Sequence, residues 1–305
     1  MEKIMRLYYV WPKFPSISIT GSACALNCRH CNKVYLKHMI AATTPAKLLK
    51  LCKILKNKGA QGVLISGGCD SQGNMLNLRK FLLALKKVHE MGLIIKLHTG
   101  FVDPELAQQI VESGTDIASM EFVGDTQTIT EIFGIDATTD TYLETFRNLQ
   151  NAGMPFIAPH IAVGLHYGKL TGEVNALKLM KDNGIRISTI AVIVFRPTKG
   201  TQLANLSAPE PGDVATVVRA ARRFFPNTKI ILGAMRPRSS TRNDPNKNIR
   251  FDIELAAVRA CINGVEIPSP KLIRNLKQNG YKLKRLEAYG VLPIEYEERV
   301  GFSWL

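Results

Sequence analysis

The sequence predicts a (βα)8 barrel of the TIM type, and three observations lead to that fold class. Short apolar runs rich in β-branched residues alternate with longer amphipathic stretches along most of the 305 residues. The joints between them repeat: a polar residue or two and a glycine precede each new apolar run, and glycine just past a helix adopts the left-handed cap conformation without steric cost. The runs are almost continuously apolar, as strands of a buried parallel sheet should be.

We expect eight strands that alternate with eight helices. The strands are expected at about residues 17–20, 63–65, 94–97, 117–123, 157–163, 188–194, 229–233 and 264–267. The helices are expected at about residues 45–57, 75–90, 104–113, 140–151, 173–183, 212–225, 249–262 and 270–278. Pro45, Pro104 and Pro270 stand at expected helix starts, where proline is tolerated because its missing N–H would have no partner there.

The repeat divides the chain into three segments. Residues 1–15 form an N-terminal extension, residues 16–280 form the barrel and residues 281–305 form a C-terminal extension. Both extensions are rich in aromatic side chains, such as Trp11 and Trp304. We expect them to pack on the barrel floor, and an interface is the alternative.

The chain is strongly basic, with 40 Lys and Arg residues against 25 Asp and Glu residues and a formal net charge of +15. Such a charge attracts acidic partners, whether nucleic acid, an acidic protein or a phosphorylated ligand. The alternative is that many lysines only solvate helix faces, as Lys47 and Lys50 would. No arginine-rich or aromatic-interleaved block of the nucleic-acid-binding kind stands out, so nucleic acid is not an expected partner.

Composition also predicts the compartment. The sequence has no apolar run near the 18 residues that a membrane span needs. The stretch Met1 to Arg6 lacks the apolar core of a secretory signal. Six cysteines, three of them in one loop, do not form the pattern of a disulfide framework. We therefore expect a cytoplasmic protein without a membrane partner.

The clearest motif is a C-x3-C-x2-C run made by Cys24, Cys28 and Cys31. Thiolates favour iron-sulfur clusters or zinc, and a four-iron cluster held only by cysteine takes four of them. A cluster on three cysteines keeps one iron open for a small ligand. A structural zinc site is the alternative, with His30 as a fourth ligand that would bind only under strain.

This loop resembles that of the radical S-adenosylmethionine (radical SAM) superfamily. The resemblance implies a 4Fe-4S cluster on the three cysteines and S-adenosylmethionine (SAM), bound through its amino and carboxylate groups, as the second cofactor. The segment Ser66-Gly67-Gly68-Cys69-Asp70 resembles the glycine-glycine-acid segment that holds the SAM amino group, although Cys69 displaces the acid.

Further motifs resemble the biotin synthase-like branch of that superfamily. Asp125, with Glu121 as the competing candidate, resembles the acid that takes the ribose hydroxyls, and Val163-Gly164-Leu165 resembles the segment beside the adenine. Asp140 departs from the branch, because biotin synthases have a basic residue there. The resemblance assigns cofactor binding to His30, Ser66, Gly67, Gly68, Glu121, Asp125, Val163, Gly164 and Leu165.

Polar residues at the expected strand ends are candidates to face the substrate. They are His98, His160, His166, Arg196 and Arg236, the last where biotin synthases have an inward arginine. Arginine binds a carboxylate or phosphate through two donors, and histidine exchanges a proton near neutral pH. Ser239, Ser240 and Thr241, among Arg236, Arg238 and Arg242, form either an anion or cluster-edge site or a solvated loop.

The remaining cysteines depart from biotin synthases, which carry further cysteines on strands 3, 4 and 5 for a second, sulfur-donating cluster. Here those strands offer His98, Met120 and the region of His160. Cys52 and Cys261 fall inside expected helices as packing residues. Cys69 could ligate or react. A second cluster bound by cysteine alone is therefore not expected in this chain.

The resemblance implies reductive cleavage of SAM to a 5'-deoxyadenosyl radical, which takes hydrogen from an unactivated C–H bond. Within the branch we expect sulfur insertion for lipoyl or biotin-like cofactor synthesis, as in the archaeal two-component lipoyl synthases. The implied partners are a ferredoxin or flavodoxin, an acidic lipoyl carrier protein and a second radical SAM subunit. The alternatives are a radical SAM mutase or carbon-carbon bond enzyme without sulfur insertion, and a nucleic-acid-binding iron-sulfur or zinc protein.

Overall fold

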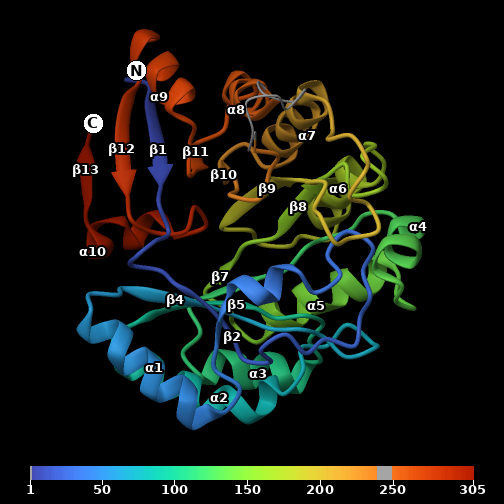
Figure 1. The fold of residues 1–305 in the computed structure, drawn as a ribbon, viewed down its shortest axis with the longest axis vertical. Coiled ribbons are helices and arrows are strands. Elements are labelled where there is room, and N and C mark those ends of the chain that lie inside the picture. Colours follow the sequence, from blue (N-terminus) through green and yellow to red (C-terminus); the bar gives the residue numbers. More distant parts are fainter. Residues whose placement is uncertain (1, 239–248) are drawn as a thin grey trace.

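The computed structural model describes residues 2–238 and 249–305, and it shows an α/β fold built on parallel strands (Figure 1). Every predicted strand and helix is present. The strands are β2 (Ser16–Ser18), β4 (Gly62–Ser66), β5 (Ile94–His98), β6 (Ile117–Ser119), β7 (Phe156–Ile157) with its continuation β8 (His160–Val163), β9 (Thr189–Val194), β10 (Lys229–Leu232) and β11 (Gly264–Glu266). The helices are α1 (Pro45–Asn57), α2 (Leu78–Glu90), α3 (Pro104–Glu112), α5 (Thr139–Asn151), α6 (Glu173–Asp182), α7 (Pro211–Phe224), α8 (Ile249–Arg259) and α9 (Pro270–Gln278).

Smaller elements lie in the connections. They are a 3-10 turn η1 (Tyr35–His38), β3 (Ile40–Ala41), α4 (Thr126–Thr128), a π-helical turn η2 (Ile129–Phe133), a 3-10 turn η3 (Ile294–Tyr296) and α10 (Glu297–Val300). No described helix has both the length and the apolar character that a membrane crossing requires.

The sequence explains where the longer helices begin. The α3 helix starts with Pro104 directly after Asp103, whose side chain accepts a hydrogen bond from the Leu106 backbone N–H. The α9 helix starts with Pro270 after Ser269, which accepts in the same way from Leu272. A capping side chain satisfies one orphan N–H, and proline has no N–H that needs a partner, so both residues favour a helix start.

The predicted α/β barrel architecture is confirmed, and among the described residues its strands form two sheets that do not close into one hydrogen-bonded ring. Their orders are β13-β12-β1-β11-β10-β9-β8 and β3-β2-β4-β5-β6-β7. The sheets meet where Ala158 and Pro159 interrupt one strand, and a parallel bridge joins Glu121 to His160 there. No strand pairing among the described residues joins β2 or β3 to the other sheet. The barrel is therefore open on that side.

The two chain ends supply strands to the first sheet. The β1 strand (Ile4–Tyr8) lies between β11 and β12 (Lys282–Leu286), parallel to both, and β13 (Phe302–Trp304) pairs antiparallel with β12. Residues 1–15 and 281–305 are thus part of the same sheet as the barrel strands (Figure 1).

The inside of the barrel is apolar at one end. Interior side chains from the strands meet side chains of the segment after β12 and close this end; they are Leu64, Ile94, Ile117, Ala191 and Ile231 with Ala288, Tyr289, Val291 and Leu292. A second and larger core lies between the sheets and the surrounding helices. Packed apolar layers of this kind are typical of barrel interiors.

A buried carboxylate fastens the C-terminal segment to β1. Glu297 is 1% exposed and accepts a hydrogen bond from Arg6 Nε at 2.7 Å and from Lys284 Nζ at 2.7 Å. Burial alone would raise the pKa of Glu297, but the hydrogen bonds from Lys284 and Arg6 outweigh it and lower that pKa.

Replacing Glu297 with alanine should reduce the free energy of unfolding by about 3–5 kcal/mol, because two largely buried cations would lose their counter-ion. Urea unfolding followed by circular dichroism measures this loss. The carboxylate's contribution is present above its unfolded pKa and is lost as the pH falls through its lower folded pKa, so variant and wild type should converge in acid. Glu298→Ala, exposed on the same helix, is the control; an equal loss in both variants would contradict the assignment.

Candidate active site

The three-cysteine loop crosses the mouth of the barrel and is tied down from three directions. Ala25 N–H donates to Cys69 O at 2.7 Å, after β4. Arg29 N–H donates to Ile132 O at 2.8 Å, in η2, and Arg29 O accepts from Gln202 N–H at 3.1 Å, after β9. The loop has little regular structure of its own, so these backbone hydrogen bonds hold its cysteines in place.

The three thiols are half-buried, and Cys28 interacts electrostatically with both Cys24 and Cys31. Burial, together with the charges of Cys31, Cys24 and Cys69, raises the pKa of Cys28 to about 12. Within residues 2–238 and 249–305, no three Cys, His, Asp or Glu side chains form a group that could hold one metal ion. A structural zinc ion needs its ligands around one point, whereas the cysteines of a four-iron cluster bind different irons.

Gly68 packs directly against the start of the cysteine loop. A Cβ atom on Gly68 would lie 2.1 Å from Ala23 O and 2.4 Å from Cys24 Cβ, so only glycine permits this approach. Gly68 N–H donates to Thr20 Oγ1 at 2.8 Å, and Cys69 N–H donates to Cys24 Sγ at 3.3 Å. The segment after β4 therefore contacts the first cysteine directly.

His30, within the loop, stacks edge-on against Phe133 with their ring centroids 5.0 Å apart. Its Nδ1 is buried and has no hydrogen-bond partner in the described part of the chain. Burial lowers the pKa of His30 to about 4, so the ring is neutral at physiological pH. An unpaired buried ring nitrogen next to the cysteines is free to bind a ligand.

The two acids assigned to the ribose lie in different surroundings. Glu121 lines a cavity together with Thr128, Leu165 and His166, and burial raises the pKa of Glu121. Asp125 caps α4, where its oxygens accept hydrogen bonds from the Gln127 and Thr128 backbone N–H groups. Of the two acids, only Glu121 lines this cavity.

Hydrogen bonds to α6 and to the residue after β9 hold the segment Val163-Gly164-Leu165 at the end of β8. Gly164 N–H donates to Glu173 Oε1 at 2.7 Å, and a Cβ atom on Gly164 would lie 2.1 Å from Pro209 Cγ. Val163 O accepts from Phe195 N–H at 2.9 Å. Leu165 is the member of the segment that lines the cavity.

Two of the substrate-side candidates meet inside the barrel. The rings of His98 and His160 lie edge-on with centroids 5.2 Å apart. His160 Nε2 lies 3.4 Å from Lys96 Nζ, and Ser66 Oγ lies 3.4 Å from His98 Nδ1. Lys96 was missed by the sequence reasoning, although a lysine inside the apolar run of β5 was a signal that could have found it.

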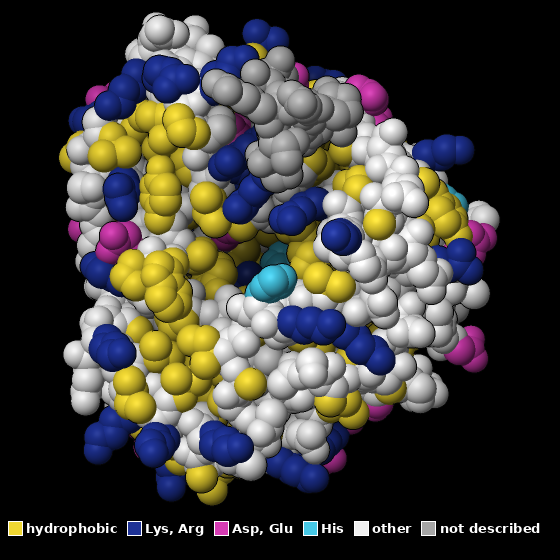
Figure 2. Space-filling model, viewed as in Figure 1, with side chains coloured by type: hydrophobic (Ala, Val, Ile, Leu, Met, Phe, Trp, Pro, Cys, Tyr) yellow, Lys and Arg dark blue, Asp and Glu magenta, His cyan; other side chains and the backbone are white. Residues whose placement is uncertain are grey.

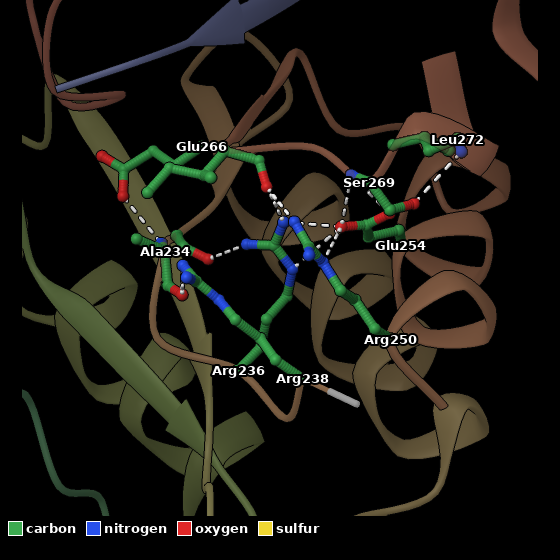
Figure 3. Close-up of polar contacts among 10 residues, drawn as sticks. Ala234, Arg236, Arg238, Arg250, Glu254, Glu266, Ser269 and Leu272 are labelled. Atoms are coloured by element: carbon green, nitrogen blue, oxygen red, sulfur yellow. Dashed lines mark hydrogen bonds and ion pairs between the residues drawn. The ribbon is translucent and has the colours of Figure 1, made fainter. Parts of the chain in front are cut away.

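Arg236 does not face the substrate space, which corrects the expectation for this residue. It is 0% exposed, and its Nη2 donates to Glu254 Oε1 at 2.6 Å and to Ile267 O at 2.9 Å (Figure 3). Arg250 donates to the same Glu254 oxygen at 3.2 Å. The arginine is thus occupied by a buried ion pair and by carbonyls, and it stabilises the fold.

The other basic candidates lie nearer the surface. Arg196 follows β9 and is exposed, and Arg238 is also exposed. His166 lies 3.1 Å from Thr128 Oγ1, at the cavity. Figure 2 shows that the face is hollowed near its centre, with histidine in the hollow and Lys and Arg side chains around it. Ser239, Ser240, Thr241 and Arg242 lie outside the described residues.

Comparison of the sequence with known proteins finds a matching family model and similar enzymes. Residues 18–168 match the model of the Radical SAM superfamily. The biotin synthase of Coxiella burnetii is 26% identical over 231 residues, 72% of this chain and 68% of the relative. The biotin synthase of Vibrio cholerae is 24% identical over 232 residues, 72% of this chain and 63% of the relative.

Solved structures share the fold at lower identity. Methylornithine synthase (PylB) is 18% identical with a TM-score of 0.60, over 91% of this chain and 83% of that one. The FeFe-hydrogenase maturase HydG from Carboxydothermus hydrogenoformans is 13% identical with a TM-score of 0.63, over 92% of this chain and 67% of that one.

The fold and the site together define a barrel enzyme that carries a three-thiol loop at its mouth. Residues 18–168 match the radical SAM superfamily, and the chain is similar to biotin synthases at 24–26% identity. The family implies a 4Fe-4S cluster and SAM, and the residues present fit both. Three half-buried thiols on one loop would supply the sulfur ligands, and the buried His30 Nδ1, unpaired among the described residues, would be available to a ligand beside them.

Replacing Gly68 with alanine should lower the iron content of the reconstituted protein, because a clash of this size costs about 1–3 kcal/mol and moves the Cys24 backbone. Iron analysis and visible absorption measure the occupancy. Gly212→Ala is the matched control, since nothing lies within 4 Å of a Cβ atom there. Full iron occupancy in Gly68→Ala would show that the loop does not depend on this contact.

Proposed function

We propose that this radical SAM enzyme abstracts hydrogen from an unactivated C–H bond of its substrate. The observation that carries the proposal is the loop of Cys24, Cys28 and Cys31 held across the barrel mouth. When bound, the cluster and SAM supply the 5'-deoxyadenosyl radical, so the hard chemistry belongs to the cofactors. The chain's own residues bind, orient and shield the reactants.

Several residues would perform that work. His30 would contact SAM through its unpaired ring nitrogen, and Glu121 would accept the ribose hydroxyls from its place on the cavity. The apolar end of the barrel, closed by Tyr289 and Leu292, would keep water from entering from below. A radical formed at the mouth would then meet the substrate before solvent.

For the reaction that follows, we propose sulfur insertion into a lipoyl-like or biotin-like precursor. The relatives that support it are biotin synthases matched over 72% of the chain. The net charge of +15 suits an acidic carrier protein. The cluster needs an external electron donor such as a ferredoxin or flavodoxin, in a reducing compartment, and a second radical SAM subunit could complete the sulfur supply.

The second candidate is a rearrangement or carbon-carbon bond reaction without sulfur insertion. One observation favours it: the barrel strands β5, β6 and β8 carry no cysteine, and they present Lys96, His98 and His160 where sulfur ligands would be needed. The name of methylornithine synthase, which shares the fold, shows that such barrels also serve other chemistry.

Iron counting separates the two reactions. A single cluster corresponds to about four irons per chain and a second four-iron cluster to about eight. The cysteine positions lead us to expect about four in the chain purified alone. A count near eight would require ligands other than cysteine and would favour sulfur insertion.

Reducing the reconstituted protein with SAM under anaerobic conditions should form 5'-deoxyadenosine, measured by chromatography. Cys28→Ala should lose the cluster absorption and the product together, because a cluster ligand is missing. Cys261→Ser, at an exposed cysteine away from the loop, should retain both. No product from wild type, together with salt-dependent RNA binding, would point instead to a nucleic-acid-binding iron-sulfur protein.

A further inference from the structure

The inside of the barrel changes character one layer above its apolar end. Ile94 belongs to the apolar layer, whereas Lys96 and His98, which follow on the same face of β5, are polar. Ser119 on β6 and His160 on β8 join them, with Ser119 Oγ 3.3 Å from His160 Nε2. Burying a polar group costs free energy unless it has a hydrogen-bond partner, so the partners of each group in this layer decide whether the layer is complete.

Lys96 is the group that most clearly lacks a partner. It is 5% exposed, and within residues 2–238 and 249–305 its one hydrogen-bond contact is His160 Nε2 at 3.4 Å, although an ammonium group has three N–H donors. Its Nζ also lies 4.9 Å from the centre of the Tyr289 ring. In the described part of the chain no carboxylate comes within the 4.0 Å of an ion pair, whereas buried Lys284 and Arg236 both have one.

Two carboxylates lie in the region of Lys96, and neither forms an ion pair with it among the described residues. Glu266 accepts from Ala234 N–H at 2.7 Å through one oxygen and from Gly290 N–H at 2.6 Å through the other. Glu121 lines the cavity on the other side of the bridge to His160, and among the described residues it forms no ion pair with Lys96 within 4.0 Å. Neither acid satisfies the ammonium group.

A second unsatisfied atom lies beside the lysine. His98 Nε2 is buried and has no hydrogen-bond partner among the residues that the structure describes, while Nδ1 of the same ring lies near Ser66 Oγ. Burial and the charge of Lys96 hold the pKa of His98 well below its usual range, so its ring is neutral. Burial also lowers the pKa of Lys96 to about 8, which leaves Lys96 mostly charged at pH 7. A cation and a free ring nitrogen thus face the same interior space.

This polar layer lies directly below the cysteine loop. Ser66 ends β4, and two residues later Gly68 packs against Cys24. A molecule bound at Lys96 and extending towards the mouth would therefore have its far atoms next to the proposed radical.

We propose that Lys96, with His98, binds the carboxylate of a small free acid inside the barrel. The rest of the acid then extends towards the cysteine loop. The assignment of this acid as the substrate rests on the proposed radical SAM function; the binding site itself does not. A carboxylate would give the ammonium group the acceptor that it lacks, and charge-assisted hydrogen bonds are the strong ones. Of the proposed substrates, this site favours a free acid such as a biotin-like precursor, because an acyl chain joined to a carrier protein through an amide has no carboxylate to offer Lys96.

The test is calorimetric titration of the cluster-reconstituted protein with butanoate, hexanoate and octanoate, each compared with its amide. Wild type should bind at least one carboxylate about tenfold or more tightly than the matching amide, and Lys96→Met should lose about tenfold or more of that affinity. Lys229→Met is the matched control, because Lys229 is also buried but donates to Tyr8 OH and the Leu292 carbonyl near the closed end of the barrel. It should bind the carboxylate as wild type does.

Equal binding of acid and amide, unchanged binding by Lys96→Met, or no carboxylate binding by wild type would each overturn the proposal. His98→Gln serves if Lys96→Met does not fold, and it should weaken carboxylate binding by about threefold or more through the loss of one hydrogen bond. The formation of 5'-deoxyadenosine by wild type is scored separately. Lys96-dependent binding without that product would leave the site standing and refute the radical SAM function, and the reverse result would refute only the site.

Discussion

Cys24 and Gly68 come from the ends of neighbouring strands, and their backbones approach more closely than any side chain at position 68 would allow. This contact places the first cysteine over the barrel opening, and the hydrogen bonds from Ala25 and Arg29 spread the rest of the loop across it. A loop with so little structure of its own is ordered only because the ends of three barrel strands hold it. The position of the proposed cluster therefore depends on the packing of the whole mouth.

Buried charge has two different uses in this chain. The Arg236–Glu254 pair, at 2.6 Å, joins the segment after β10 to α8. The Lys284–Glu297 pair, at 2.7 Å, joins β12 to α10. Lys96 is equally buried and has no carboxylate at that distance among the residues that the structure describes. A paired buried charge stabilises the architecture, and an unpaired one is retained where a ligand can complete it.

The open barrel also shapes the site. The first and last segments extend one sheet, and the residues after β12 fill the lower end of the interior, so the space inside is closed below and accessible at the mouth. The filled lower end leaves the polar layer and the cysteine loop above it as the part of the interior that a substrate would contact.

The sequence by itself determined the order of strands and helices, the helix starts at Pro104 and Pro270 and the spacing of the three cysteines, because caps, periodicity and short motifs act within a few residues. Tertiary structure alone decided that β1 lies inside the sheet, that the ring is not closed, that Arg236 pairs with Glu254 and that Lys96 meets His160. Each of these depends on which distant strands become neighbours. The direction in which a charged side chain points follows from those long-range pairings and cannot be read from its position in the chain.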